Sequence, residues 1–368
     1  VSSTARTATW NGDASVGNAG DGMNWGDANN WTRGTVPDSA PLVADEVVFA
    51  GGSSQNTVNL QTARIVGGVK FEADYTLTGG ALTVLSGNIS VASNITANLQ
   101  SNTLAQSANA SVRKLGPGRL LVNGTLGQTV VLDGTLGGNG TINNLVAYAD
   151  SVIAPGNSVG ALVVTNDYRQ RDGSILEMEI QGTTPVTQHD QLQVGDQAFL
   201  NGTLETIVGG GYMDPTTPGT LDSFVLITAA DIESSFDQVV YNGSPLVPSF
   251  GVDNNGSFVS HVDDGLFRVV KYGETTMSLQ NYAAIPGDAN GDRVVDGSDF
   301  NIWNTNKFSP GFGWLSGDFN GDNAVDGSDY NIWNINKFTS VDGVLVPEPS
   351  GVFVLVAMVG LLGFRRGR

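Results

Sequence analysis

Residues 118–142 read GRLLVNGTLGQTVVLDGTLGGNGTI, a run of apolar pairs broken by small turn residues. Gly-Thr followed by Leu or Ile occurs at 124–126, 134–136 and 140–142, and again at 202–204 and 219–221. Glycine supplies the backbone conformation of a tight turn, and Thr and Leu favour the extended strand that follows it. The stretch therefore predicts short strands separated by Gly or Asn corners.

The same signals continue on both sides of this stretch. In YTLTGGALTVLSGNISVASNITANL (75–99) apolar and polar residues alternate, as at Leu82 and Val84, which is typical of half-buried strands. No helical period appears between residues 42 and 280. We therefore predict a mainly β protein with a right-handed parallel β-helix, or solenoid, over 51–280, in which each coil stacks on its neighbour. Because the strand spacing is irregular, a β-sandwich is the alternative.

The first 50 residues have a different composition. Trp10, Trp25 and Trp31 lie in Gly- and Asn-rich text, whereas the other three Trp follow residue 302. We expect an N-terminal cap region over 1–50. The chain begins VSSTARTATW, without Met or an apolar leader, so we interpret it as processed or truncated and expect any export signal to lie outside it.

Composition excludes several classes of function. The 368 residues include 36 acidic and 17 basic ones, a net charge of −19, which argues against a nucleic-acid partner because phosphate binding needs clustered Lys and Arg. There is no Cys, so a disulfide framework, a zinc–thiolate site and a cysteine nucleophile are excluded. The sequence contains two His, so few residues could serve as the base of a Ser-His-Asp triad. Low charge density and acidity suit an extracellular protein or one that binds divalent cations.

Two acidic segments near the end of the chain repeat each other. GDANGDRVVDGSDFNIWNTNKF (287–308) returns thirty positions later as GDFNGDNAVDGSDYNIWNINKF (317–338). Counted from the first Asp, side-chain oxygens fall at positions 1, 3, 5, 9 and 12 and a backbone carbonyl at position 7, which is EF-hand spacing. The predicted ligands of two Ca²⁺ ions are Asp288, Asn290, Asp292, Val294, Asp296 and Asp299 in the first loop and Asp318, Asn320, Asp322, Ala324, Asp326 and Asp329 in the second.

Calcium binding has a simple alternative, which is that Asp, Asn and Gly form ordinary turns. Agreement of two copies at all six positions favours metal, because carboxylates this close repel one another without a cation. Such an ion would contribute folding energy rather than catalysis. The apolar position 8, Val295 and Val325, is where we expect the two loops to bridge through backbone hydrogen bonds.

Residues 281–340 resemble the type I dockerin module. The resemblance lies in the two copies, Asn at position 3, Asp rather than Glu at position 12, and a short helix after each loop. It implies a small α-helical calcium module and a cohesin-like partner. We expect the aromatic residues that follow the loops to form its core: Phe300, Trp303, Phe308, Tyr330, Trp333 and Phe338.

Two positions depart from the dockerin pattern. Position 6, normally Gly, is Arg293 in the first loop and Asn323 in the second, so we expect weaker binding in the first. The partner-facing positions are Gly297-Ser298 and Gly327-Ser328 rather than Ser-Thr. Calcium binding is therefore better supported than a cohesin partner.

Part of the β region resembles the passenger β-helix of autotransporters and related adhesins. The matching residues are APGNS at 154–158, Gly160 with Leu162 and Val164, and Asp190-Gln191-Leu192. The resemblance implies an extracellular solenoid suited to adhesion or carbohydrate contact. Residues 281–340 stand where that family has its translocating barrel, so export by that route does not follow.

The C-terminal text, VPEPSGVFVLVAMVGLLGFRRGR (346–368), resembles the PEP-CTERM sorting signal of Gram-negative bacteria. Pro347, Glu348 and Pro349 match its motif, an uncharged stretch covers 351–364, and Arg365 and Arg366 begin the basic end. The resemblance implies transient membrane insertion of a hydrophobic sorting helix and removal of the tail by an exosortase-type protease. The alternatives are a permanent anchor, for which fourteen apolar residues are few against about twenty, and a buried core helix.

An enzyme is the main competing interpretation of the β region. Glu177 and Glu179 alternate on one face of a predicted strand, and paired carboxylates hydrolyse or cleave polysaccharides in some β-helices. Asp167, Arg169, Arg171 and Asp172 precede them. A solvated outer face explains the same alternation without catalysis. His189, beside Asp190, is expected at the surface, and His261 has no nucleophile nearby in sequence.

Together these observations predict a non-enzymatic, exported protein of the cell surface or extracellular matrix, with two calcium ions and an adhesive or carbohydrate-associated role. A polysaccharide-degrading hydrolase or lyase and a structural matrix or surface-layer component are the alternatives.

Overall fold

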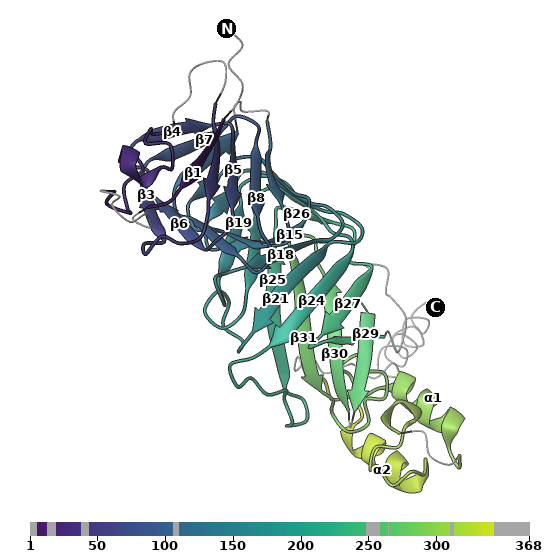
Figure 1. The fold of residues 1–368 in the computed structure, drawn as a ribbon. Coiled ribbons are helices and arrows are strands. Elements are labelled where there is room, and N and C mark those ends of the chain that lie inside the picture. Colours follow the sequence, from purple (N-terminus) through teal and green to yellow (C-terminus); the bar gives the residue numbers. More distant parts are fainter. Residues whose placement is uncertain are drawn as a thin grey trace, which may run out of the picture.

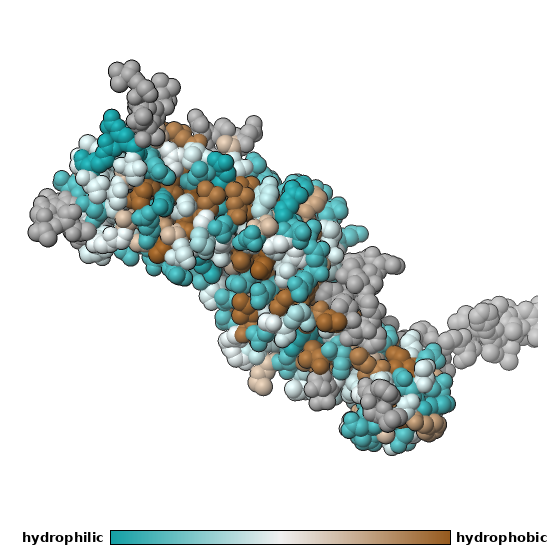
Figure 2. Space-filling model, turned by 45° about the vertical axis from the view of Figure 1, so that its right-hand side comes forward, coloured by the Kyte–Doolittle hydropathy of each residue, from teal (hydrophilic) through white to brown (hydrophobic). Residues whose placement is uncertain are grey.

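A computed structural model describes residues 6–12, 20–37, 44–105, 110–247, 258–263, 265–309 and 313–341. The described part of the chain is mainly β with largely parallel sheets, and its two α-helices follow the last strands. Figure 1 shows an elongated β body that runs from the N-terminal strands to β29–β31, with the helices α1 and α2 beyond them. On the face drawn in Figure 2, apolar residues occur in small groups among polar ones.

Three sheets make up the β body. The first sheet contains β1 (Thr7–Trp10), β2 (Glu46–Phe49), β5 (Gly68–Phe71), β8 (Asn88–Val91), β11 (Val112–Leu115), β14 (Thr129–Val131), β17 (Leu145–Ala147), β20 (Tyr168–Gln170), β23 (Gln197–Phe199) and β26 (Asp231–Glu233). The second contains β3 (Thr57–Asn59), β6 (Tyr75–Thr78), β9 (Thr96–Leu99), β12 (Arg119–Val122), β15 (Gly134–Gly138), β18 (Ser151–Pro155), β21 (Ile175–Ile180), β24 (Thr203–Val208), β27 (Gln238–Tyr241) and β28 (Ser244–Pro245). The third contains β4 (Ala63–Val66), β7 (Ala81–Val84), β10 (Asn102–Ala105), β13 (Thr125–Leu126), β16 (Thr141–Ile142), β19 (Ala161–Val164), β22 (Gln191–Val194), β25 (Leu221–Thr228), β31 (Thr276–Ala283), β30 (Leu266–Tyr272) and β29 (Phe258–Asp263).

From β2 to β27, successive strands belong to the first, the second and the third sheet in turn. Each strand pairs in parallel with the strand three places further along, as β12 pairs with β15 and β15 with β18. In register, Leu120 lies beside Leu136, and Leu136 beside Ile153. Equivalent side chains therefore stack in rows along the body.

The core follows from alternation within the short strands. In β12, β19 and β21 every second side chain is buried, and the residues between them are half-buried. The corners bring backbone segments too close for a side chain. Gly134, which precedes Thr135, has φ +67°, and a Cβ there would collide with the carbonyl oxygen of Gly116. The Gly-Thr corners of the sequence therefore serve both turn formation and close packing.

The N-terminal region shares this core. Trp10, Trp25 and Trp31 are buried, with ring centroids 5.0 Å apart for Trp10–Trp31 and 4.8 Å for Trp25–Trp31. Phe49 on β2 lies against all three and stacks on Phe71 at 5.0 Å. A short 3-10 helix, η1 (Ala28–Asn30), lies between Trp25 and Trp31 in sequence.

At the other end the pairing changes direction. β25, β31, β30 and β29 form antiparallel pairs in the third sheet, and β28 pairs antiparallel with β27 in the second. A second hydrophobic cluster begins here around Phe267, Val269, Tyr282 and Ala284, with Trp314 and Leu315 of η2 (Trp314–Ser316) packed against it. This cluster joins the β body to the segment that carries α1 (Gly297–Asn306) and α2 (Gly327–Asn336).

Candidate metal centre

Each acidic loop runs directly into a helix, and its last two predicted ligands cap that helix. Asp296 accepts a hydrogen bond from the Ser298 N–H at 2.7 Å, and Asp299 accepts one from the Asp296 N–H at 2.8 Å, which is a reciprocal capping box. Asp326 and Asp329 cap α2 in the same way. The predicted short helix after each loop is thus present, and its start is fixed by ligand positions 9 and 12.

The first loop folds around the carboxylate of Asp288. One oxygen of this side chain accepts from the Gly291 N–H at 2.7 Å and the other from the Arg293 N–H at 3.0 Å. Asp299 reaches back and accepts from the Ala289 N–H at 2.9 Å. Positions 1 and 12 are thereby brought to the inside of one loop.

The second loop repeats this arrangement almost unchanged. Asp318 accepts from Gly321 at 2.8 Å and from Asn323 at 2.9 Å, and Asp329 accepts from Phe319 at 2.9 Å. The corresponding distances in the two loops differ by no more than 0.1 Å. The sequence repeat is therefore also a repeat of three-dimensional structure.

Position 6 adopts the left-handed conformation that normally selects glycine. Arg293 has φ 74° and Asn323 has φ 65°. Asn tolerates this region because its short side chain bonds locally, whereas Arg incurs a steric cost of about 1–2 kcal/mol. The backbone of the first loop is thus the more strained of the two.

Burial of the carboxylates sets the electrostatics of the site. Asp288 and Asp299 are fully buried. Burial, followed by the nearby charges of Asp299 and Asp292, raises the pKa of Asp288 to about 7. Burial also raises the pKa of Asp299 to about 6 and shifts that of Asp329 upward. Carboxylates gathered away from water are costly as anions unless a cation lies among them.

The predicted ligand positions of both loops offer oxygen atoms and include no His or Cys. Within the described part of the chain, no three His, Cys, Asp or Glu side chains are grouped so that they could hold a metal ion. Each loop also offers an Asn amide oxygen, at Asn290 and Asn320, and a backbone carbonyl, at Val294 and Ala324. These oxygens and the buried carboxylates make an all-oxygen set of the kind that Ca²⁺ takes.

The predicted bridge between the two position-8 residues is wrong. Val295 accepts a backbone hydrogen bond from Phe338 at 2.6 Å and donates one to Thr339 at 2.9 Å, while Phe308 donates one to Val325 at 2.7 Å. Each loop therefore pairs with the segment that follows the other loop's helix. The helices end at Asn306 and Asn336, and the chain then turns back toward the opposite loop.

The predicted aromatic core is partly correct. Phe300, Trp303, Tyr330 and Trp333 form one cluster, with ring centroids 5.0 Å apart for Phe300–Trp333 and 5.1 Å for Trp303–Tyr330. Phe308 does not join it, because its side chain is 82% exposed. Phe308 and Phe338 have φ 65° and 68°, a left-handed turn that ends the helical face on which the other aromatics lie.

Two residues outside the loops touch the first site and were not predicted. The Tyr282 hydroxyl on β31 donates to Asp288 at 3.0 Å, and the indole nitrogen of Trp314 donates to the Asp288 carbonyl at 2.7 Å. No equivalent of Tyr282 is recorded for Asp318 among the described contacts. Tyr282 lies on β31 and Trp314 on η2, both outside the twelve-residue loops, so a loop motif carries no signal for either contact.

The carboxylates considered for catalysis lie on the outer face of the second sheet. Glu177 and Glu179 alternate with the buried Leu176, Met178 and Ile180, and Glu177 is in register with Glu205 on β24. Burial raises the pKa of Glu177. The Ser158 hydroxyl donates to Glu179 at 3.0 Å.

The histidine prediction for this region is wrong. His189 is fully buried, with its Nδ1 3.0 Å from the carbonyl oxygen of Gly182 and its ring edge-on to Phe224. Asp190 is buried beside it and accepts from the Gly160 and Glu179 N–H groups. Asp190 thereby links the backbone just before β19 to β21, and neither side chain of the pair faces solvent.

A scan against models of protein families and a search of curated proteins return no match to this chain. The predicted sorting residues, Pro347, Glu348, Pro349, Arg365 and Arg366, lie outside the described residues. Among those that are described, no helix has the length and apolar character needed to cross a membrane.

Proposed function

We propose that this chain is an exported, non-enzymatic protein of the cell surface or extracellular matrix that binds two calcium ions and has an adhesive or carbohydrate-associated role. The repeated loop geometry supports the calcium part of the proposal. In both loops the carboxylates at positions 1 and 12 accept the same backbone hydrogen bonds, and the corresponding distances agree within 0.1 Å. Asp288, Asn290, Asp292, Val294, Asp296 and Asp299 would hold one ion, and Asp318, Asn320, Asp322, Ala324, Asp326 and Asp329 the other. When bound, Ca²⁺ would neutralise the buried carboxylates and so stabilise this segment.

The β body is interpreted as a right-handed parallel β-helix. Pairing of each strand with the third strand along supports this over a β-sandwich, whose sheets are antiparallel. Outward residues of such a body form a long, weakly charged face. That face suits contact with a polysaccharide or another surface component.

Export and partners follow from the resemblances in the sequence. A PEP-CTERM-like tail at 346–368 implies a Gram-negative bacterium, transient insertion in the membrane as a hydrophobic helix, and an exosortase-type protease as partner. A dockerin-like module at 281–340 implies a cohesin-like or other extracellular protein partner.

Thermal unfolding of the full chain in calcium and in a chelator tests the proposal. Two added ions are expected to raise the unfolding temperature of the segment that carries α1 and α2, since they bind the folded form alone. The matched control is Asp288→Asn with Asp318→Asn, which removes position 1 from both loops. Equal unfolding temperatures in calcium and chelator for the natural sequence would contradict the proposal.

A polysaccharide-degrading enzyme is the second candidate, favoured by the register of Glu177 beside Glu205. Glycan cleavage that is lost in Glu177→Gln would support it. A structural matrix or surface-layer role is the third, and calcium-dependent self-assembly of the chain without its tail would favour that role.

A further inference from the structure

A cavity of about 400 Å³ opens at the end of the β body. None of its lining residues is a predicted calcium ligand. Its walls come from the end of β24 and the loop after it, from the β27–β28 turn and β28, and from β29 and β30. The lining residues are Val208, Tyr212, Asp214, Tyr241, Asn242, Ser244, Pro245, Leu246, Ser260, His261, Val262 and Arg268. This volume lies within the range of about 300–1,000 Å³ that is usual for small-ligand pockets. The cavity forms where the parallel rotation of strands stops and antiparallel pairs begin.

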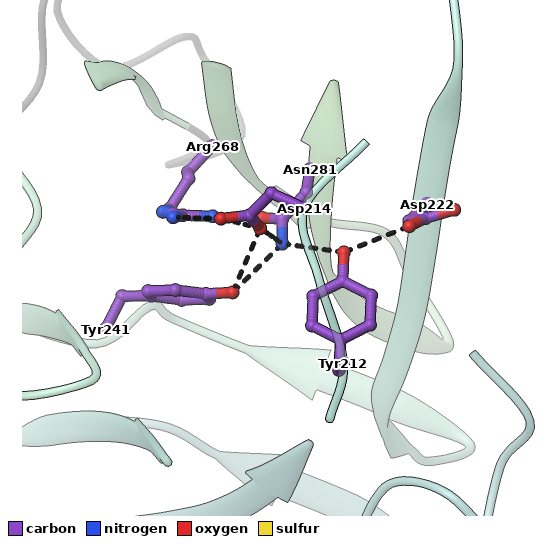
Figure 3. Close-up of polar contacts among 6 residues, drawn as sticks. All are labelled: Tyr212, Asp214, Asp222, Tyr241, Arg268 and Asn281. Carbon is purple, nitrogen blue, oxygen red and sulfur yellow. Dashed lines mark hydrogen bonds and ion pairs between the residues drawn. The ribbon is translucent and has the colours of Figure 1, made fainter. Parts of the chain in front are cut away.

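A polar network fixes one wall of the cavity (Figure 3). The Arg268 guanidinium binds Asp214 through two hydrogen bonds of 2.9 and 2.8 Å and lies 3.5 Å above the centroid of the Tyr241 ring. The buried Asn281 amide donates to Asp214 at 2.8 Å and to the hydroxyls of Tyr212 and Tyr241 at 3.1 Å each. These side chains come from four separate strands or loops, and the network holds them in one orientation.

Asp222 accepts from the Tyr212 hydroxyl at 3.0 Å and belongs to the network but not to the lining of the cavity, which is polar without net formal charge. Among the described residues that line the cavity, Asp214 and Arg268 carry the formal charges, and their pairing cancels them. Burial raises the pKa of Tyr241 to about 12, so its hydroxyl stays protonated at physiological pH. A phosphate, sulfate or uronate would need a cationic group that is not already paired, and a metal ion would need an unpaired carboxylate.

The rest of the lining alternates apolar and hydrogen-bonding groups. Pro245 and Leu246 provide apolar surface, and Asn242, Ser244 and Ser260 provide short donors and acceptors. A sugar ring has C–H groups on its faces and hydroxyls around its edge, so it requires both kinds of surface within a few ångströms. Uncharged polar groups suit the hydroxyls, since each hydroxyl donates and accepts.

We propose that this cavity binds a neutral saccharide, with the ring against the apolar wall and its hydroxyls bonded to the Asp214 side and the β27–β28 turn. The choice of ligand class rests on the carbohydrate-associated role proposed above, whereas the choice of site does not. Asn281 and Arg268 are positioning residues, because they orient Asp214 and the two tyrosines.

An array of neutral oligosaccharides from cellulose, xylan, galactan, mannan and N-acetylglucosamine polymers tests the site with the full chain, with oligogalacturonate as the acidic comparison. The strongest neutral oligosaccharide is then titrated against Ser244→Trp, which would fill the cavity from an exposed position on β28. The matched control is Thr57→Trp, an exposed residue on β3 at the opposite end of the same sheet. Affinity is expected to fall at least about tenfold in Ser244→Trp and to stay unchanged in Thr57→Trp.

If Ser244→Trp does not fold, Val262→Trp provides a second variant with a filled cavity, because Val262 is exposed on β29 and also lines the cavity. Unchanged affinity in the filled, folded variants would overturn the site and leave the carbohydrate role standing. Absence of binding to every oligosaccharide tested, neutral and acidic, would overturn both the site and the carbohydrate-associated role. Preference for oligogalacturonate over the neutral probes would contradict the uncharged character assigned to the ligand.

Discussion

The indole nitrogen of Trp303 donates a hydrogen bond to the backbone carbonyl of Asp326, 2.9 Å away. Trp333 makes the reciprocal contact with Asp296 at 2.8 Å. Each helix therefore fixes the position-9 residue of the other loop, and the backbone pairs at Val295 and Val325 add a second reciprocal connection. The two loops are thus linked as one unit, although their sequences are consecutive repeats.

Replacing Trp303 by Phe is expected to weaken calcium binding in the second loop. The substitution keeps an aromatic ring in the cluster but removes one of the two donors to the Asp326 carbonyl, leaving the Tyr330 N–H at 3.2 Å, a cost of about 0.5–1.5 kcal/mol. Calcium titration in an Asp288→Asn background, where the second loop binds alone, measures the change. Tyr330→Phe is the control, because it removes a hydroxyl from a neighbouring ring of the cluster and keeps the Tyr330 N–H that bonds to the Asp326 carbonyl. Equal affinity in the Trp303 and Tyr330 variants would show that the loops are independent.

Replacing Arg293 by Gly should tighten calcium binding in the first loop by a few fold. Gly adopts φ 74° without the Cβ clash, so about 1 kcal/mol of strain is relieved. Asn323→Gly is the matched change in the second loop and should have a smaller effect, since Asn already tolerates this conformation. Titration of both variants would contradict the account if Asn323→Gly gave the larger gain.

Replacing Tyr282 by Phe should weaken the first site and spare the second. The lost hydroxyl donates to Asp288 at 3.0 Å and helps to keep that carboxylate ionised. We expect a several-fold loss of calcium affinity in the first loop, measured in an Asp318→Asn background. Tyr272→Phe is the control, because this buried tyrosine on β30 bonds to the Phe236 N–H instead. A similar loss in both variants would indicate general destabilisation.

The stability of the calcium-free chain should fall as pH rises from about 4 to about 7. Folding raises the pKa of Asp288 from 3.8 to about 7 and that of Asp299 to about 6, so in this window the folded state binds protons that the unfolded state has released. The expected loss is roughly 2–4 kcal/mol. Thermal unfolding in chelator between pH 4.5 and 7.5 measures it, and saturating calcium should remove the trend. Rising stability in chelator over this range would contradict the assignment.

The sequence predicts what depends on local periodicity. Alternation at residues such as Leu82 and Val84 marks strands because one face of each is buried. Agreement of the two acidic repeats at all six predicted ligand positions indicates the loops and the helices that follow them. Each strand and each loop is recognised from residues that lie a few positions apart within it, so no knowledge of distant contacts is needed.

Contacts between distant segments escape this kind of prediction. Asp214 and Arg268 are 54 residues apart, and neither lies in a motif, so the cavity network has no local signal. Phe308 follows the helical spacing, yet a left-handed turn after Asn306 carries it into solvent. His189 is in a polar stretch but is buried against Phe224, which lies 35 positions further along the chain.

Calorimetric titration of the full chain with Ca²⁺ tests the central claim most directly. The account predicts two ions per chain, one ion in either Asp288→Asn or Asp318→Asn, and none with sub-millimolar affinity when both are changed. No binding heat for the natural sequence, together with identical unfolding curves in calcium and chelator, would contradict it.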